Sequence, residues 1–276
     1  MHYLTRLVEF EASHRYWNPT FSAEENRRIF GKCVSLYGHG HNYVLRVTLS
    51  GQVDHRTGMI MNVKELDRIL KDVTNEFDHQ FINLDHPAFH NRIPTTENLA
   101  SYMSDQIELT LRAQNRPYQL SCLRLYEEPT LWAEVFSGEG RSMPSFTKTF
   151  SFSAAHRLHS TALSDQENRA VFGKCNNPHG HGHNYELEVT VQGSIVPETG
   201  MIMDLGVLMQ IVQEALIDRF DHKHLNEDTA EFRALNPTGE NIVKVMWDLL
   251  KPQLGDRLTR IGLWETPKNF FEYSGE

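Results

Sequence analysis

The sequence is short of several features that would place it in a special class. It has no run of about 18 apolar residues, so no segment is typical of a membrane-spanning helix. Its first residues lack the charged-then-apolar pattern of a signal peptide. The formal charge is −9 and no basic run occurs, which argues against general binding to nucleic acid or anionic membranes. Three cysteines are too few for a disulfide framework. These absences predict a cytoplasmic protein in a reducing compartment.

Histidine is abundant by contrast, and several of its 15 copies lie in motifs that occur twice. Phe-Glu-Ala-Ser-His-Arg (10–15) recurs as Phe-Ser-Ala-Ala-His-Arg (152–157), and Gly-His-Gly-His-Asn-Tyr (38–43) recurs unchanged (180–185). The offset is 142 residues in both cases (10 to 152, 38 to 180), and one inserted residue makes it 143 between Glu97 and Glu240. We therefore predict one duplicated domain, with a first copy at residues 1–140 and a second at residues 145–276.

Each copy has the same pattern of expected elements. Apolar and polar residues alternate near 8–12 and 43–49, which predicts two strands. Asn62 begins a capping-box pattern and Asp204 is a good N-cap at the matching place, so a helix follows in each copy. Second helices are expected after Thr96 and Thr238. An apolar stripe marks the last of these helices: Ile242, Val245, Met246, Leu249 and Leu250.

Two closing strands complete each copy, at 120–127 with 131–136 and at 258–265 with 269–273. The order ββααββ predicts an α+β domain in which a four-stranded antiparallel sheet carries two helices on one face. Such a sheet has unpaired edges, which proteins normally pair or cover. We therefore expect the chain to form a homo-oligomer.

Three histidines of each copy are expected to form a metal site. His39 and His41 lie two residues apart on a strand and share a face, and His14 ends the preceding strand. If the two strands pair as a hairpin, the three side chains meet. A lone His-x-His pattern is more often two surface histidines, but the whole set recurs as His156, His181 and His183. Three ligands with one open position are typical of catalytic zinc, so we expect one zinc ion per domain and two per chain.

Cys33 and Cys175 each stand six residues before the first histidine of the pair, directly after a Gly-Lys. A buried cysteine is usually inert, and Cys122, in an apolar strand without a counterpart, fits that description. For the other two, a nearby cation and metal are expected to lower the thiol pKa and supply a thiolate.

Acidic residues follow in matching places. Asp78-His79 and Asp221-His222 come after the first long helix of each copy, where they either orient a catalytic cysteine or simply end a helix favourably. Two carboxylates, Glu127 and Glu265, lie in the third strand of each copy among apolar residues. Such a carboxylate is either solvated at a strand end or bound by paired N–H groups of a ligand.

Together these motifs resemble the 6-pyruvoyl-tetrahydropterin synthase family, which also contains 6-carboxytetrahydropterin synthase of the queuosine pathway. The resemblance rests on Phe-Gly-Lys-Cys-Asn-Asn-Pro-His-Gly-His-Gly-His-Asn-Tyr (172–185), Thr-Gly-Met-Ile-Met-Asp (199–204), Asp-His-Lys-His-Leu-Asn (221–226) and Trp-Glu-Thr (264–266). It spans nearly all of the second copy and most of the first. It implies the tunnelling fold, a four-stranded sheet with two helices whose subunits join edge to edge.

The resemblance also implies roles. The six histidines would bind zinc, the two cysteines would be catalytic thiols, and each Asp-His pair would complete a proton relay that can serve a neighbouring domain. Glu127 and Glu265 would anchor the pterin. The implied reaction converts 7,8-dihydroneopterin triphosphate, with loss of triphosphate, into 6-pyruvoyl-tetrahydropterin. Five residues between cysteine and histidine favour this product, whereas tandem duplication favours the carboxy product. A non-catalytic zinc-binding assembly module is a further alternative.

Overall fold

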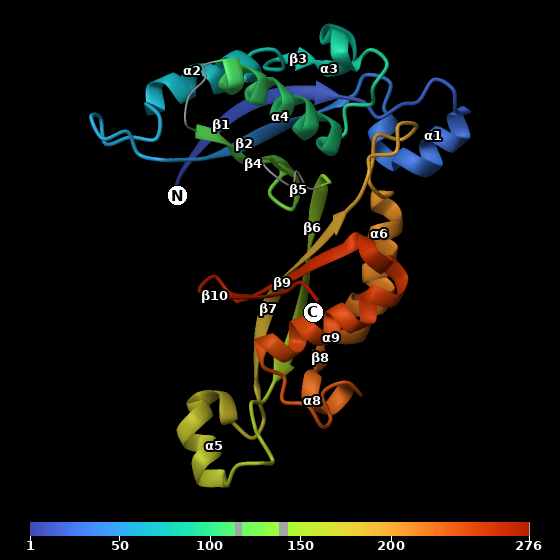
Figure 1. Ribbon diagram of the computed structural model, residues 1–276. Helices are drawn as coiled ribbons and strands as arrows, with labels where there is room; N and C mark the ends of the chain where they lie inside the picture. Colours follow the sequence, from blue (N-terminus) through green and yellow to red (C-terminus); the bar gives the residue numbers. More distant parts are fainter. Residues whose placement is uncertain (114–117, 138–142, 276) are drawn as a thin grey trace. The chain divides into compact units, whose positions relative to one another are not determined.

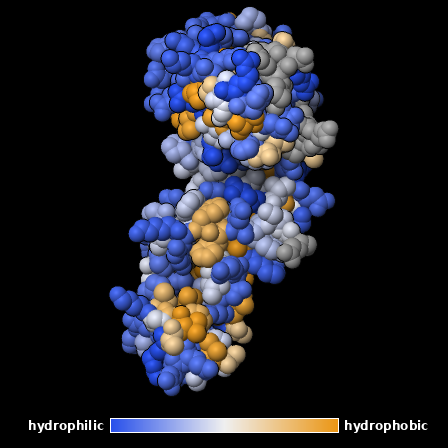
Figure 2. Space-filling model, turned by 60° about the vertical axis from the view of Figure 1, so that its left-hand side comes forward, coloured by the Kyte–Doolittle hydropathy of each residue, from blue (hydrophilic) through white to orange (hydrophobic). Residues whose placement is uncertain are grey.

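A computed structural model describes residues 1–113, 118–137 and 143–275. The chain divides into two compact units (Figure 1). Unit 1 comprises Met1–Thr147 together with Gln192–Gly206, and unit 2 comprises Lys148–Val191 with Val207–Glu276. No helix among the described residues is long and apolar enough to cross a membrane. Figure 2 shows a largely hydrophilic surface on which hydrophobic groups gather in a few places.

The described residues of the first repeat form four long strands, one short strand and three longer helices. In chain order its main elements are β1 (His2–His14), α1 (Ala23–Phe30), β2 (His39–Gly51), α2 (Val63–Thr74), β3 (Gln80–Phe81), α3 (Ile82–Asp85), α4 (Thr96–Ala113), β4 (Tyr118–Glu128) and β5 (Leu131–Phe136). The strands pair in the order β5-β4-β2-β1-β3. Among these pairs of described strands, β1–β3 is parallel and the others are antiparallel.

The second repeat has the same plan. Its main elements are β6 (Ser145–His156), α5 (Asp165–Phe172), β7 (His181–Gln192), α6 (Leu205–Val212), α7 (Asp218–Phe220), β8 (Lys223–His224), α8 (Leu225–Asp228), α9 (Gly239–Leu254), β9 (Leu258–Thr266) and β10 (Asn269–Tyr273). The strand order is β10-β9-β7-β6, and β8 pairs with β6. The predicted α+β class, with an antiparallel sheet and helices on one face, is confirmed.

Strand alternation places one face of each sheet in the core. Tyr43 and Leu45 of β2 are fully buried, as are Tyr185 and Leu187 of β7. Helix α4 packs on β4 and β5, and α9 packs on β9 and β10, so the long helices cover this buried face. The face of each sheet that the sequence predicts to be apolar is therefore the face that the helices cover.

In each repeat, the polar segment between the first two strands contains a helix that the sequence analysis did not predict. Ser22 caps α1 with a full capping box, in which its side chain and that of Glu25 bond each other's backbone N–H. Ser164 and Glu167 do the same for α5. At α2 the expected box is only half formed, because Asn62 accepts from the N–H of Lys64 without the reciprocal bond.

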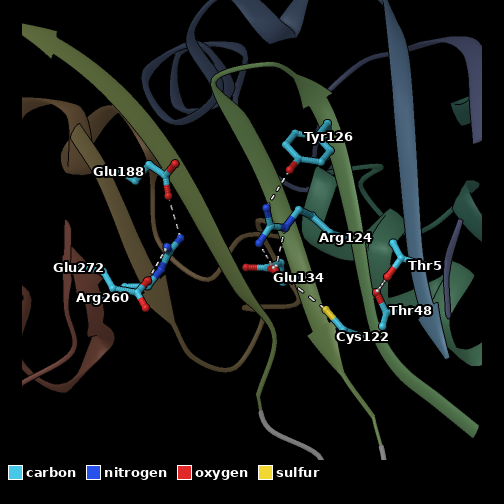
Figure 3. A network of polar contacts seen from close by, with 9 residues as sticks. All are labelled: Thr5, Thr48, Cys122, Arg124, Tyr126, Glu134, Glu188, Arg260 and Glu272. Carbon is cyan, nitrogen blue, oxygen red and sulfur yellow. Dashed lines mark hydrogen bonds and ion pairs between the residues drawn. The ribbon is translucent and has the colours of Figure 1, made fainter. Parts of the chain in front are cut away.

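The opposite face of each sheet carries charged and hydroxyl side chains (Figure 3). In unit 1, Arg124 donates to Glu134 and to the Tyr126 hydroxyl. Cys122, expected among apolar neighbours, instead has its Sγ 4.0 Å from a Glu134 oxygen, and burial beside that carboxylate raises its pKa to about 11. Its thiol is therefore protonated at neutral pH, as expected of an inert cysteine.

In unit 2, Arg260 makes the corresponding contacts, with Glu188 and Glu272 (Figure 3). The Trp264 indole also donates to Glu188. The charged groups on this face pair with one another within the sheet, so no helix is needed to cover the face. In both units the helices therefore lie on the face that carries the apolar side chains.

Candidate metal centre and its surroundings

The β1–β2 hairpin brings three histidines of the first repeat together. His14 lies opposite His39, and Ala12 lies opposite His41. Gly38 sets the start of β2 because its φ is +73° and a Cβ there would lie 2.6 Å from the His14 carbonyl oxygen. The predicted hairpin and the meeting of the three side chains are confirmed.

The geometry of the ring nitrogens suits a bound cation. His14 Nε2 and His39 Nε2 are 3.3 Å apart, and two nitrogens bound at about 2.0 Å to one tetrahedral zinc would be about 3.3 Å apart. His39 Nδ1 and His41 Nε2 are buried without a hydrogen-bond partner among the described residues. A buried polar atom without a partner is costly, and a metal ion would satisfy one of these atoms directly.

The tautomer of His14 is fixed by its surroundings. Its Nδ1 lies 2.9 Å from the Pro94 carbonyl oxygen, which can only accept a hydrogen bond. Nδ1 therefore carries the proton and Nε2 presents a lone pair to the cluster, as in most histidine metal ligands. Burial, followed by the neighbouring histidines, holds the pKa of His14 well below its ordinary value. The ring is neutral at pH 7, which is the form that binds a metal.

The second repeat repeats this arrangement. His156 Nε2 and His181 Nε2 are 3.2 Å apart, and His156 Nδ1 bonds the Pro237 carbonyl. His183 Nε2 is buried and has no hydrogen-bond partner in the part of the chain that the structure describes. Burial lowers the pKa of His156 to about 4. Both groups could hold a metal ion, and in the first repeat a Glu127 oxygen belongs to the same group.

Glu127 and Glu265 both face their histidines. Glu127 Oε1 is 3.5 Å from His41 Nε2, and Glu265 Oε1 is 3.8 Å from His183 Nε2. The sequence analysis expected Glu127 to be solvated or bound by a ligand. Glu127 is not solvated, because it is buried and accepts hydrogen bonds from the hydroxyls of Tyr16 and Thr96, and its binding of a ligand stays a prediction.

Cys33 lies in the loop after α1 and packs against Tyr16 and Phe30. The sequence analysis expected a lowered thiol pKa. The protein groups around Cys33 act in the opposite direction, because burial, Glu127 and Glu128 raise its pKa to about 11, and the lowering by a bound metal stays a prediction. Cys175 occupies the same place after α5, where its carbonyl accepts from the Leu158 N–H as that of Cys33 does from Tyr16.

The Asp-His pairs do not stand beside the cysteine of their own unit. Asp78 accepts from the Glu11 N–H and His79 lies 3.3 Å from the Glu11 carboxylate. Glu11 and His14 differ in parity along β1, so the pair is on the sheet face away from the metal centre. Asp221 bonds the Ser153 N–H in the same way. His79 and His222 both have φ near +57°, uncommon for a non-glycine residue.

A buried carboxylate that the sequence analysis did not single out, Glu97, lies near the first centre. Its Oε1 accepts from the Ile202 N–H, so the segment 192–206 of the second repeat completes this part of unit 1. In Figure 1 that segment, in orange, lies beside α1. Met201 packs there against Tyr16 and Phe30. The only signal in the sequence was the recurrence of Glu97-Asn98 as Glu240-Asn241.

Known proteins match about half of the chain at a time. The 6-pyruvoyl tetrahydropterin synthase family model matches residues 3–138 and again 145–276. The 6-pyruvoyl tetrahydrobiopterin synthase of Poecilia reticulata is 48% identical to this chain, over 47% of this chain and 89% of its own length. The enzyme of the same name from Homo sapiens is 44% identical, over 50% of this chain and 97% of its own length.

A 6-carboxy-5,6,7,8-tetrahydropterin synthase of Haemophilus influenzae is 30% identical over 48% of this chain and 99% of its own. Among solved structures, the Caenorhabditis elegans 6-pyruvoyl tetrahydropterin synthase is 42% identical, with a TM-score of 0.47, and the match covers 49% of this chain and 99% of that one. Two consecutive family matches account for nearly the whole sequence. The chain therefore belongs to the 6-pyruvoyl tetrahydropterin synthase family, with one family domain in each repeat.

Proposed function

We propose that the chain is a zinc-dependent lyase that converts 7,8-dihydroneopterin triphosphate, with loss of triphosphate, into 6-pyruvoyl-tetrahydropterin. The observation that carries the proposal is the three-histidine group next to a loop cysteine, found in each repeat. The chain is an enzyme of the pterin synthase type, as its family membership shows. The pyruvoyl product is preferred because relatives with that name are 44–48% identical, against 30% for the carboxy enzyme.

Each proposed role follows from position. The histidines of each group would hold zinc, which when bound supplies a Lewis acid toward substrate hydroxyls. Cys33 and Cys175 are the candidate bases for a carbon-bound proton, and Glu127 and Glu265 are candidate substrate-binding carboxylates.

The Asp78-His79 and Asp221-His222 pairs face away from the thiol of their own unit. They can therefore act only on a thiol presented by another domain. For this reason we also propose that the active form is a homo-oligomer, in which one domain supplies the relay for its neighbour. A cytoplasmic location remains a prediction of the sequence alone.

Product analysis tests the proposal. The zinc-loaded full-length protein is incubated with 7,8-dihydroneopterin triphosphate, and the pterin products are separated by chromatography and identified by mass spectrometry. We expect release of triphosphate and the pyruvoyl product. The carboxy product with acetaldehyde would replace the proposed reaction by that of the carboxy enzymes. No turnover by a protein with two bound zinc ions would favour the non-catalytic assembly module.

A further inference from the structure

Each repeat contains a loop and a docking segment that have counterparts in the other repeat. The loop follows the second strand and has the sequence Thr-Gly-Met-Ile-Met, at residues 57–61 and 199–203; we call it the methionine loop. The docking segment, at residues 93–98 and 236–241, leads into α4 or α9. Within unit 1, the methionine loop of the second repeat lies on the docking segment of the first. The structure therefore shows one loop paired with one docking segment.

The formed contact combines polar bonds with burial of an apolar side chain. The Thr95 hydroxyl donates to the Gly200 carbonyl oxygen, and Glu97 Oε1 accepts from the Ile202 N–H at 3.1 Å. Met201, between these two hydrogen bonds in the sequence, is 6% exposed. Glu97 is also 6% exposed, so both partners of the contact are shielded from solvent.

This contact also forms part of the wall around the first metal centre. Pro94 of the docking segment holds His14, because its carbonyl oxygen lies 2.9 Å from His14 Nδ1. Met201 belongs to the same buried cluster as Tyr16, and Cys33 packs against that cluster. A residue of the second repeat thus lies beside the candidate base of the first.

The methionine loop of the first repeat has the same conformation but is uncovered. The Gly58 N–H donates to the Asp54 carbonyl oxygen at 2.8 Å, and the matching bond of Gly200 is 2.7 Å long. Their φ angles are +70° and +73°. A Cβ on Gly200 would lie 2.7 Å from Asn98 Nδ2, whereas one on Gly58 would meet no atom of the described residues within 4 Å. Met59 is accordingly 40% exposed.

The docking segment of the second repeat is formed in the same way and is uncovered too. The Thr238 N–H and the Asn241 side chain both donate to the Asn236 carbonyl oxygen, each at 2.8 Å. The first repeat has the same two bonds, at 2.8 and 2.9 Å. Glu240 stands at the place of Glu97 and is exposed instead of buried. The segment therefore has the shape of its occupied counterpart and an exposed acceptor for a loop.

The surroundings for a methionine side chain are largely retained in the second repeat. The three buried residues that cluster with Met201 have their counterparts in Leu158, Phe172 and Asn236. Two of these counterparts are apolar, so the second docking segment can also bury a methionine.

We propose that the first-repeat methionine loop of one chain docks on the second-repeat docking segment of another copy of the chain. The Thr238 hydroxyl donates to the Gly58 carbonyl oxygen, and Glu240 accepts from the Ile60 N–H. The partner is a second copy because each chain carries one uncovered loop and one uncovered segment with the bonding residues of the formed pair. Two copies can satisfy each other, so the contact can close into a symmetric assembly.

The two centres are then completed differently. A loop of the same chain covers one side of the first centre, whereas Met59 of another copy lies beside Cys175 at the second. This inference rests on the homo-oligomer of the proposed function and names its contact. It depends neither on the metal nor on the reaction.

Site-specific photo-crosslinking tests the contact in the full-length protein. Arg56 is exposed and corresponds to Glu198, whose carbonyl oxygen accepts from the Asn18 side chain at the rim of the formed contact. With p-benzoyl-phenylalanine in place of Arg56, irradiation should give a product of twice the chain mass. Mass spectrometry of its peptides should place the crosslink in residues 158–172 or 236–241 of the second chain.

The same photo-crosslinking residue in place of Leu109, which is exposed on α4, serves as the control. It should give no crosslink to these two segments. Crosslinks of the Arg56 position that stay within one chain, lie in other segments or are absent would overturn the inference.

Association strength gives a second readout. Glu240→Ala removes a charged acceptor for the Ile60 N–H, so the dissociation constant of the assembly should rise at least about tenfold. Glu240→Gln keeps an acceptor oxygen and should weaken association less. Asp256→Ala removes the same charge at the other end of α9 and is the matched control. Light scattering across a dilution series measures the three variants, and an equal effect of Glu240→Ala and Asp256→Ala would overturn the inference.

Failure of this contact and failure of the proposed function are distinguishable, because neither readout uses zinc or turnover. A protein without lyase activity that gives the predicted crosslink would leave the contact in place. An assembled and active protein that crosslinks elsewhere would overturn the contact and leave the proposed function standing.

Discussion

The three-histidine group could be predicted from the sequence because the relation between its residues is local. Alternation along a strand places His39 and His41 on one face, and one hairpin adds His14. The surroundings of Glu127 could not be predicted in this way. Its donors Tyr16 and Thr96 are 111 and 31 residues away in the sequence, and no periodic pattern connects residues across such distances.

The burial of Glu97 could not be predicted from the sequence either, because it depends on a segment of the second repeat. Desolvation, together with the charge of Glu127, raises the pKa of Glu97 from its ordinary value of 4.5 to about 7. Between these values the folded protein keeps a proton that the unfolded chain has released. The contribution of Glu97 to the free energy of unfolding therefore falls as the pH rises from 4.5 to 7.

Glu97→Gln should remove this dependence. At about 1.4 kcal/mol per pKa unit, the free energy of unfolding of the variant relative to wild type should rise by about 3 kcal/mol between pH 4.5 and pH 7. Urea unfolding at several pH values measures the difference. The counterpart in the second repeat, Glu240, is exposed in the single chain, so Glu240→Gln at a dilution that keeps the chains apart serves as the matched control. Equal slopes for the two variants would contradict the assignment.

At the scale of elements, strands were easier to predict than helix faces. β5 and β10 begin and end where the alternation placed them, at 131–136 and 269–273. For α9, the predicted stripe is partly wrong. Ile242, Met246 and Leu250 are buried as expected, but Val243 and Trp247 are buried too. The buried face is wider because α9 packs on two strands, and Trp247 meets Tyr273 of β10 edge to face.

This packing predicts different costs for two neighbouring leucines of α9. Leu250 is fully buried, whereas Leu249 is only half-buried. Leu250→Ala should lower the free energy of unfolding by about 2–5 kcal/mol through lost burial and the cavity it leaves. Leu249→Ala should cost clearly less. Chemical denaturation of both variants measures this, and a larger loss for Leu249→Ala would mean that the face of α9 is wrongly assigned.

At the scale of the whole molecule, equivalent loops of the two repeats have different surroundings. The segment 192–206 packs within unit 1, where Met201 is 6% exposed. Its counterpart in the first repeat leaves Met59 40% exposed. On its side away from β2, β1 pairs with β3 only at Ala12 and Ser13, so most of that edge is open among the described residues. An open edge and an exposed loop are surfaces that a second copy of the chain can cover.

We therefore expect a homo-oligomer whose activity falls on dilution to the single chain. Light scattering combined with an activity assay across a dilution series measures both quantities. Met59→Glu, which places a charge in the exposed loop, should weaken assembly, whereas Leu109→Glu, at an exposed position of α4, should not. A fully active particle with the mass of one chain, 31.9 kDa, would contradict this expectation.

The most direct test of the central claim is the effect of Cys175→Ala on turnover and zinc content in the same preparation. The thiol is proposed as a base and not as a ligand, so the turnover of 7,8-dihydroneopterin triphosphate at the centre of the second repeat should fall by about 10² to 10⁴ while two zinc ions per chain remain. Cys122→Ala, outside the centre, serves as the matched control. Loss of zinc with the substitution, or turnover equal to that of the control, would contradict the account.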